Sequence, residues 1–134
     1  MQDPPSSSEL AKAVSEFLRN EAMPQLTGRT AYMARVAANV MDILCRELDQ
    51  APANDQRERS RLQALLATDN TDLLQLNQLL CDRIASGQAG LQTPGLIEHL
   101  WQLTIDKVGV DQPGYSGYKR SLDEPVPTAQ TPGG

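Results

Sequence analysis

Four polar residues of one predicted helix have the types and spacing that could bind a ligand. Arg35, Asn39 and Arg46 are separated by four and seven residues, so they line up along one edge of a helix. Glu47 falls within the apolar face of the same helix. The two guanidinium groups could grip a carboxylate or phosphate, with Asn39 as the orienting group. The alternative is an internal network of hydrogen bonds and ion pairs that ties helices together, which we favour because such networks are common in helical bundles.

The segment that must position these residues runs from Gly28 to Leu48 and has the longest uninterrupted helical pattern in the chain. At about 100° per residue, its apolar side chains share one face that covers more than half of the circumference. This face consists of Met33, Val36, Ala37, Val40, Leu44 and Leu48. We therefore predict a long, buried central helix that ends near Asp49, before Pro52.

Four further segments have helical patterns. They run from a Ser6–Glu9 capping box to Ala22, from Asn54 or Asp55 to Leu66, from Asp72 to Ser86, and from Thr93-Pro94 to Gly109. Their predicted inward residues are Leu10, Val14, Phe17 and Leu18, then Leu62, Leu65 and Leu66, then Leu73, Leu76, Leu80, Cys81 and Ile84, and last Leu96, Ile97, Leu100, Leu103, Thr104 and Val108. The sequence thus predicts an all-α fold, a compact bundle of about five helices. We expect a mobile segment at 1–7, the bundle at 8–116 and a disordered, proline-rich tail at 117–134.

Some polar and aromatic residues lie on or beside the predicted inward faces. Asn77 and Lys107 are candidates for a polar core, and Lys107 could meet Glu47. Trp101 and Tyr115 are candidates for an interaction surface, and Tyr115 could fold back over the bundle together with Tyr118. We interpret His99 as structural or solvent-facing, because no second ligand or catalytic partner accompanies it. The charged residues of the third segment, Arg57, Glu58, Arg59 and Arg61, are interpreted as a solvated surface, and the alternative is an arginine-rich patch for phosphate groups.

Composition argues against several function classes. The 134 residues carry a net charge of −5 with no block of Lys or Arg, so we expect neither nucleic-acid nor anionic-membrane binding. The N-terminus shows no signal-peptide pattern and no apolar run approaches the ~18 residues of a membrane span, which favours a cytoplasmic protein. Cys45 and Cys81 are expected to be buried, reduced thiols, because free cysteine behaves as a small hydrophobic residue; the alternative is a Cys45–Cys81 disulfide, which a reducing cytoplasm disfavours. No HExxH or CxxC motif accompanies them. We expect no metal and no cofactor.

The residues also resemble a family of small bacterial proteins that carry a domain of unknown function, over about residues 8–116. The resemblance is carried by Glu9-Leu10, Phe17-Leu18, Pro24, Gly28, residues 35–39 (RVAAN), residues 46–48 (REL), Leu76-Asn77, Leu80-Cys81, Ile84, Gly87, Asp106-Lys107, Pro113 and Tyr115. Relatives have Asn-Pro-Arg-Tyr where this chain has Gln112-Pro113-Gly114-Tyr115, which puts a charge-based role of this loop in doubt. Such proteins tend to be encoded near acyl-CoA dehydrogenases and aminoglycoside-phosphotransferase-like kinases, so the resemblance implies an accessory role.

Two functions from different classes follow. The first is a non-enzymatic helical accessory protein that binds a partner enzyme or itself, with a homodimer as the default assembly. The second is a small-ligand binder or enzyme that holds a phosphate- or carboxylate-bearing molecule of CoA type on Arg35, Asn39, Arg46 and Glu47. The first requires an exposed apolar patch, and the second requires the polar strip to open into a pocket.

Overall fold

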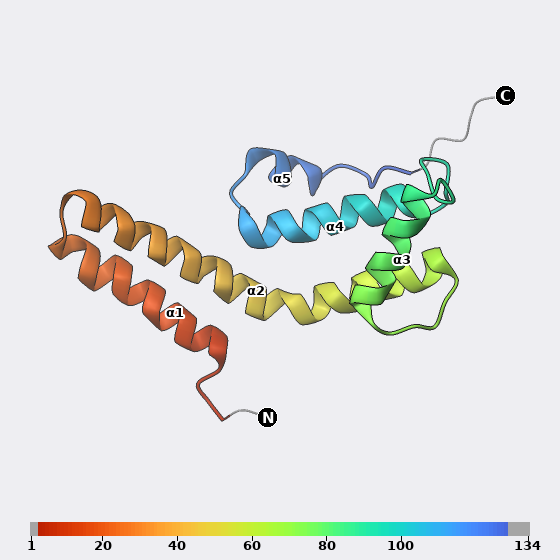
Figure 1. Cartoon of the computed structure of the whole chain (residues 1–134). Helices are drawn as coiled ribbons and strands as arrows, with labels where there is room; N and C mark the ends of the chain where they lie inside the picture. The colour runs from red at the N-terminus through yellow and green to blue at the C-terminus, as the bar shows by residue number, and fades with distance from the viewer. Residues whose placement is uncertain (1–2, 129–134) are drawn as a thin grey trace. The chain divides into compact units, whose positions relative to one another are not determined.

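The computed structural model describes residues 3–128, which contain five α-helices and no strand (Figure 1). The helices are α1 (Ser7–Phe17), α2 (Gly28–Leu66), α3 (Leu73–Ala85), α4 (Leu96–Asp111) and α5 (Ser116–Ser121). The predicted all-α fold is confirmed. The chain divides into two compact units, one that ends at Pro52 and one that begins at Ala53. Within residues 3–128, every helix is too short or too polar to cross a membrane.

The long helix α2 corrects the predicted boundary between the second and third segments. We expected the helix to end before Pro52 and a new one to start at Asn54 or Asp55, but α2 is continuous from Gly28 to Leu66 with Pro52 inside it. A proline in a helix removes one backbone donor and crowds the preceding turn, at a cost of about 3 kcal/mol. The helix nevertheless continues through Pro52 to Leu66.

The first helix begins as its sequence predicts. Ser6 Oγ accepts from the backbone N–H of Glu9 at 3.2 Å, and Glu9 Oε2 accepts from the backbone N–H of Ser6 at 2.7 Å. This reciprocal pair confirms the capping box. Helical structure continues beyond α1 as a π-helix, Leu18–Ala22, and a short 3₁₀ turn, Met23–Gln25. The helical extent to Ala22 is therefore confirmed, although its last turn is wider than an α-helix.

In the first unit, α1 and the first part of α2 lie side by side as an antiparallel hairpin (Figure 1). The side chains buried in this hairpin are small: Ala11, Ser15, Ala34 and Ala38. Small residues allow two helix backbones to approach closely, and the Ser15 hydroxyl lies 3.4 Å from the carbonyl oxygen of Ala38. The thiol of Cys45 donates to the carbonyl of Ser8 at 3.6 Å. The hairpin is held by close backbone packing and polar links rather than by large apolar side chains.

The inward faces predicted for these two helices are therefore wrong. Leu10, Val14 and Phe17 of α1 and Met33, Val40, Leu44 and Leu48 of α2 are all exposed. Periodicity shows which apolar side chains share a face, but it does not show which face a neighbouring helix covers. The alanine and serine positions meet in the hairpin because they permit the shorter distance between the two helices.

The second unit has a core of its own, built where the end of α2, α3 and α4 meet. Its buried residues are Leu62, Leu66, Leu76, Leu80, Ala89 and Leu96. The predicted inward positions Leu62, Leu66, Leu76 and Leu80 are confirmed. Cys81 and Ile84 are exposed, so α3 buries a narrower stripe than its sequence suggested, and Cys81 is not the buried thiol that we expected. Both cysteines are free.

The ends of α3 agree with the sequence, but those of α4 do not. Asp72 caps α3 by accepting from the backbone N–H of Gln75, and Gly87 follows the helix with φ +76°. The next helix starts at Leu96, after Gly95 with φ +82°, because Thr93 and Pro94 belong to a turn in which the Thr93 carbonyl accepts from Leu96 N–H.

The C-terminal end of α4 also differs from the prediction, since it passes through Gly109 and ends at Asp111. A further helix, α5, then occupies part of the tail predicted to be disordered. Residues 122–128 follow without a further helix. The part of that prediction at 129–134, like positions 1–2 of the predicted mobile segment, lies outside the described residues. Within 3–7, Ser6 caps α1 and Ser7 is its first residue.

Candidate functional site

The polar strip predicted on α2 lies on the surface of the first unit. Arg35, Asn39 and Glu47 are exposed, and Arg46 is half-buried. The Arg35 guanidinium lies over the ring of Tyr32, 5.7 Å from its centroid, which is a cation–π contact. Glu47 and Lys107 belong to different units, so their pairing stays a prediction. The strip thus lies at the surface edge of the hairpin, and Asn39 within it accepts a hydrogen bond from Arg19.

The network that does tie the two helices together centres on Asp42. Ser15 donates its hydroxyl hydrogen to Asp42 Oδ1 at 2.5 Å, and Arg19 forms an ion pair with the other carboxylate oxygen. Arg19 also donates to Asn39 Oδ1 at 2.9 Å. The Ser15 hydrogen bond lowers the pKa of Asp42, partial burial opposes it, and Arg19 and Arg46 lower it further. Sequence reasoning missed Asp42, although it lies three residues after Asn39 and on the same helix edge.

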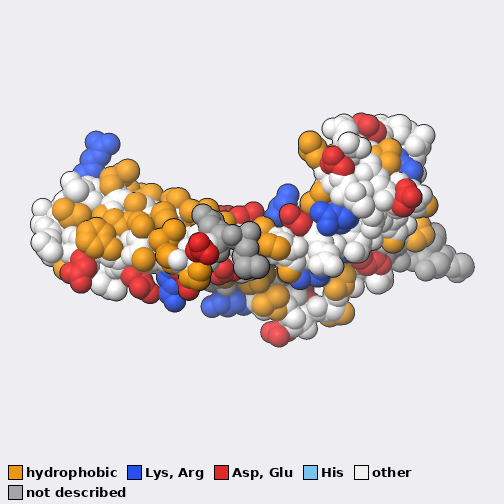
Figure 2. Space-filling model, turned by 90° about the horizontal axis from the view of Figure 1, so that it is seen from below, with side chains coloured by type: hydrophobic (Ala, Val, Ile, Leu, Met, Phe, Trp, Pro, Cys, Tyr) orange, Lys and Arg blue, Asp and Glu red, His pale blue; other side chains and the backbone are white. Residues whose placement is uncertain are grey.

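The first unit carries an exposed apolar surface on its hairpin (Figure 2). We call it the hairpin face, and it consists of Leu10, Val14, Phe17, Met33, Ala37, Val40, Leu44 and Leu48. On both helices, members of this face directly precede the buried positions of the hairpin: Leu10 and Val14 precede Ala11 and Ser15, and Met33 and Ala37 precede Ala34 and Ala38. One residue back is a rotation of about 100° in the same sense on each helix. Since the helices are antiparallel, the same rotation brings both stripes to the same side.

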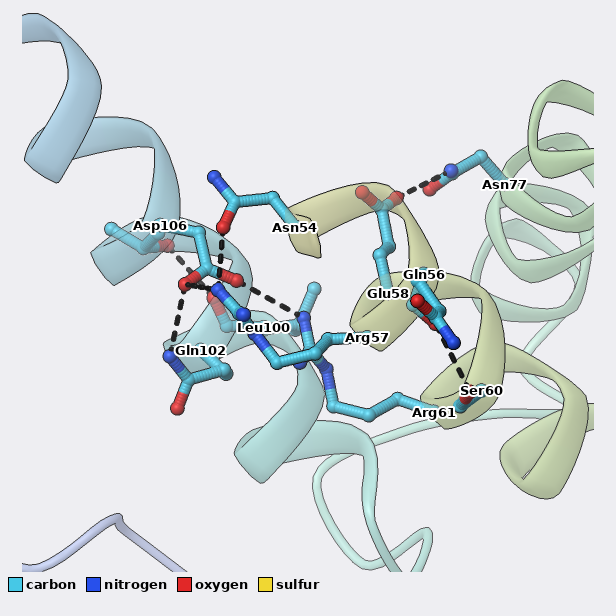
Figure 3. Close-up of polar contacts among 11 residues, drawn as sticks. Asn54, Gln56, Arg57, Glu58, Ser60, Arg61, Asn77, Leu100, Gln102 and Asp106 are labelled. Atoms are coloured by element: carbon cyan, nitrogen blue, oxygen red, sulfur yellow. Dashed lines mark hydrogen bonds and ion pairs between the residues drawn. The ribbon is translucent and has the colours of Figure 1, made fainter. Parts of the chain in front are cut away.

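In the second unit, α2 and α4 are joined by a polar cluster around Asp106 (Figure 3). Arg57 Nη2 and Arg61 Nη2 each lie 3.5 Å from an Asp106 oxygen, and Gln102 Nε2 donates to Asp106 Oδ1 at 3.2 Å. Arg57 also donates to Asn54 Oδ1 at 2.5 Å. The Asp106 side chain is 12% exposed, and two guanidinium groups compensate its charge. The cluster is a structural ion-pair network.

A second polar link joins α2 to α3. Asn77 Nδ2 donates to Glu58 Oε1 at 2.7 Å and to the carbonyl oxygen of Leu73 at 3.0 Å. Asn77 is half-buried, and Figure 3 shows its amide pointing toward Glu58. Lys107, the other polar-core candidate, is exposed on α4. The prediction that Lys107 belongs to a polar core is therefore wrong.

His99 is the most deeply buried titratable side chain in the described part of the chain, at 1% exposure, so it is not solvent-facing. Burial lowers the pKa of His99, and the nearby Arg61 lowers it further, whereas Glu58 acts in the opposite direction. His99, Arg61 and Glu98 line a cleft of about 410 Å³. Among the described residues, both ring nitrogens of His99, Arg61 Nε and Glu98 Oε2 are buried without a hydrogen-bond partner. This surrounding favours a neutral imidazole.

The aromatic candidates Trp101 and Tyr115 line an apolar cavity of about 230 Å³ between α4 and α5. Tyr118 contributes to the same wall. Trp101 is half-buried there, so it covers the seam between the two helices rather than standing out as an anchor. Tyr115 is 57% exposed.

Sequence reasoning also missed the Asp106 cluster. We interpreted Arg57 and Arg61 as solvated charges, yet the Arg61 side chain is only 23% exposed. A signal was present in the spacing, because Arg57 and Arg61 are four residues apart, as are Gln102 and Asp106. A pair of arginines on one helix can contact a pair that contains a carboxylate on another helix when the two helices pack together. Residues 3–128 hold no group of three His, Cys, Asp or Glu side chains suited to a metal ion.

Comparison with known proteins gives one match. The model of a protein family described as Domain of unknown function (DUF6285) matches residues 24–115. The matched part contains α2, α3 and α4, and it begins after α1. No curated protein and no solved structure matches the chain.

Proposed function

We propose that this chain, which belongs to the DUF6285 family, is a non-enzymatic helical interaction protein that docks through the hairpin face. The observation that carries the proposal is the exposure of seven large apolar side chains on one side of α1 and α2, at 39–58% each. Monomeric proteins rarely expose a contiguous apolar patch of more than a few hundred Å², and larger patches mark interaction surfaces.

The contrast between the two units supports this proposal. The second unit has a buried leucine cluster, whereas the first unit buries only small side chains between its two helices. A helical hairpin that keeps its large apolar residues outside has removed little apolar surface from water. A partner that covers the hairpin face would supply the burial that the hairpin lacks.

The finer role, assistance to an acyl-CoA-metabolising or kinase-like partner enzyme, is supported by the sequence resemblance alone. The alternative, a small-ligand binder on Arg35, Asn39, Arg46 and Glu47, is supported by the exposed Arg35 guanidinium. It has the weaker support, because Asn39 is already engaged by Arg19 and the strip lies on an exposed helix edge. Docking through the hairpin face is therefore the function that the geometry favours.

The test is affinity capture of the tagged full-length chain from its native host, with the bound proteins quantified by mass spectrometry. Three chains are compared: the unaltered one, a Val40→Glu/Leu44→Glu variant of the hairpin face, and Leu74→Glu as a matched control. Leu74 is 79% exposed on α3 and outside the hairpin face, so its substitution changes charge and hydropathy without touching that face.

We expect a stoichiometric protein, either another protein or an untagged copy of this chain, with the unaltered chain and with Leu74→Glu. It should be absent with Val40→Glu/Leu44→Glu, whose helical content circular dichroism would verify. A chain that captures nothing, or a double variant that captures as much as the control, would overturn the proposed function.

A further inference from the structure

We propose that the occupant of the hairpin face is a second copy of this chain, related by a two-fold axis that sets α2 antiparallel to its mate with Arg29 opposite Glu47. The proposal rests on the proposed function and names its partner. Pairing two such hairpins face to face produces a four-helix bundle, in which each copy contributes one two-helix layer.

The spacing of the apolar residues on α2 fits helix-to-helix packing of this kind. Met33, Ala37, Val40 and Leu44 follow one another at intervals of four, three and four residues. This is the a/d pattern of helices that pack nearly parallel or antiparallel with interlocking side chains. These four residues form an apolar stripe, which we call the seam. The seam is exposed on the surface of the first unit, where no helix among the described residues of that unit packs against it.

Charge placement selects a second copy and fixes its direction. Arg29 and Glu47 are both exposed, and among the described residues neither makes an ion pair. They are 18 residues apart, which is about five helical turns, so both lie at the same edge of the seam, on the side away from α1. The midpoint between them is Ala38, which is also level with the middle of the stretch from Met33 to Leu44.

A two-fold axis at that midpoint, perpendicular to the helices, inverts the direction of α2 and leaves the edge on the same side. It therefore places Arg29 of each copy against Glu47 of the other, twice in the dimer. A parallel arrangement would instead set Arg29 level with Arg29 and Glu47 level with Glu47, on opposite edges of the seam, so the opposite charges would not meet. Opposite charges at the edges of an apolar helical seam choose direction and register in this way.

The area of the hairpin face matches what a stable dimer needs. Its seven large apolar residues are 39–58% exposed, which corresponds to on the order of 700 Å² of accessible surface. A specific interface of ordinary size removes about 800 Å² from each partner. The face is thus close in size to the surface that each partner contributes to a specific interface.

The first measurement is the mass of the purified full-length chain by sedimentation velocity, over a concentration series. We expect a dimer of twice the 14.6 kDa chain mass. Val40→Glu/Leu44→Glu should weaken the dimer at least about tenfold in Kd, because four carboxylates would enter the apolar seam. Leu74→Glu should leave Kd unchanged. A monomer at all concentrations, or a dimer that resists the double substitution, would overturn the proposal.

The second measurement tests the register by exchanging charges. Glu47→Arg sets two arginines against each other at both ends of the seam and should weaken the dimer on the order of tenfold at low salt. Adding Arg29→Glu restores opposite charges and should return Kd to that of the unaltered chain. A double exchange that stays as weak as Glu47→Arg would contradict the antiparallel pairing.

The outcomes separate this inference from the proposed function. A chain that is monomeric when pure but captures a different protein through the hairpin face would overturn the self-association and retain the docking function. A chain that is monomeric and captures nothing would overturn both.

Discussion

The hydroxyl oxygen of Tyr118 lies 2.7 Å from the point that a Cβ atom would occupy on Gly109. Gly109 is a buried position inside α4, and Tyr118 lies in α5, so the missing side chain of one residue makes room for the ring of the other. This close approach explains why a glycine stands within a helix that continues past it. It also explains how a six-residue helix packs against α4.

We expect Gly109→Ala to release α5 from α4. Alanine favours the helix at this position by about 1 kcal/mol over glycine, but its methyl group would overlap the Tyr118 ring. Hydrogen exchange should show faster exchange of the α5 amides, with α4 unchanged or more protected. Gly90→Ala is the control, because nothing lies within 4 Å of a Cβ at that exposed glycine.

Removing the Tyr118 hydroxyl should partly relieve the same clash. In a Tyr118→Phe chain the nearest atom is gone, so Gly109→Ala should cost less than it does beside tyrosine, with a coupling of about 1 kcal/mol. If Gly109→Ala lowered the free energy of unfolding equally in both chains, contact with the Tyr118 hydroxyl would not be the reason for glycine at position 109.

Ser15→Ala should destabilise the hairpin by about 1 kcal/mol, since a hydroxyl that donates to the Asp42 carboxylate is lost. The ion pair with Arg19 remains, and water can hydrogen-bond to the Asp42 side chain, which is 37% exposed, so the loss of stability is limited. The pKa of Asp42 should rise toward its ordinary value of 3.8, which a carboxyl NMR titration would measure. Ser60→Ala, at an exposed α2 serine that bonds only within its own helix, should be nearly neutral.

His99 should make the chain less stable in mild acid. Its pKa is lowered in the folded chain, mainly by burial, so the unfolded chain takes up the proton first as the pH falls. Stability should therefore be full above the ordinary pKa of 6.5 and should decline as the pH falls below it toward the folded pKa. Urea unfolding at pH 7.5 and pH 5.5 would measure the difference.

The control for His99 is a chain without an imidazole. His99 is the only histidine, so His99→Gln should flatten the dependence of stability on pH between those two values. Glu58 and Arg61 are the charged groups that act on the pKa of this imidazole, and both are kept in the variant. An unchanged slope in His99→Gln would show that another group titrates.

Pro52→Ala should stabilise α2 by about 1–3 kcal/mol, because alanine supplies the backbone N–H that proline lacks and removes the crowding of the preceding turn. Slower hydrogen exchange of the amides around position 52 and a later urea midpoint would show it. Pro113→Ala, outside any helix, is the matched control and should give no gain. If Pro52→Ala unfolds earlier than the unaltered chain, the proline has a stabilising role that the helix geometry does not reveal.

The sequence by itself determined the local structure of this protein. Ser6 with Glu9 and Asp72 with Gly87 mark helix ends through contacts among neighbours in the chain, and both predictions are confirmed. The leucines of the second unit were also predictable, since Leu62, Leu66, Leu76 and Leu80 form narrow stripes with a single apolar side. In these cases, residues close together in the sequence are sufficient to predict the helix end or the buried face.

Only the tertiary structure decided which faces meet and where α2 and α4 end. In α1 and α2 the alanine and serine positions pack and the larger apolar residues stay outside, because close approach of two backbones depends on both helices together. Arg61 and Asp106 are 45 residues apart, and their pairing becomes visible only when α2 and α4 lie together. Pro52 and Gly109 looked like helix ends because the sequence shows only what each residue costs a helix, whereas the close approach of Tyr118 to Gly109 is visible only in the folded chain.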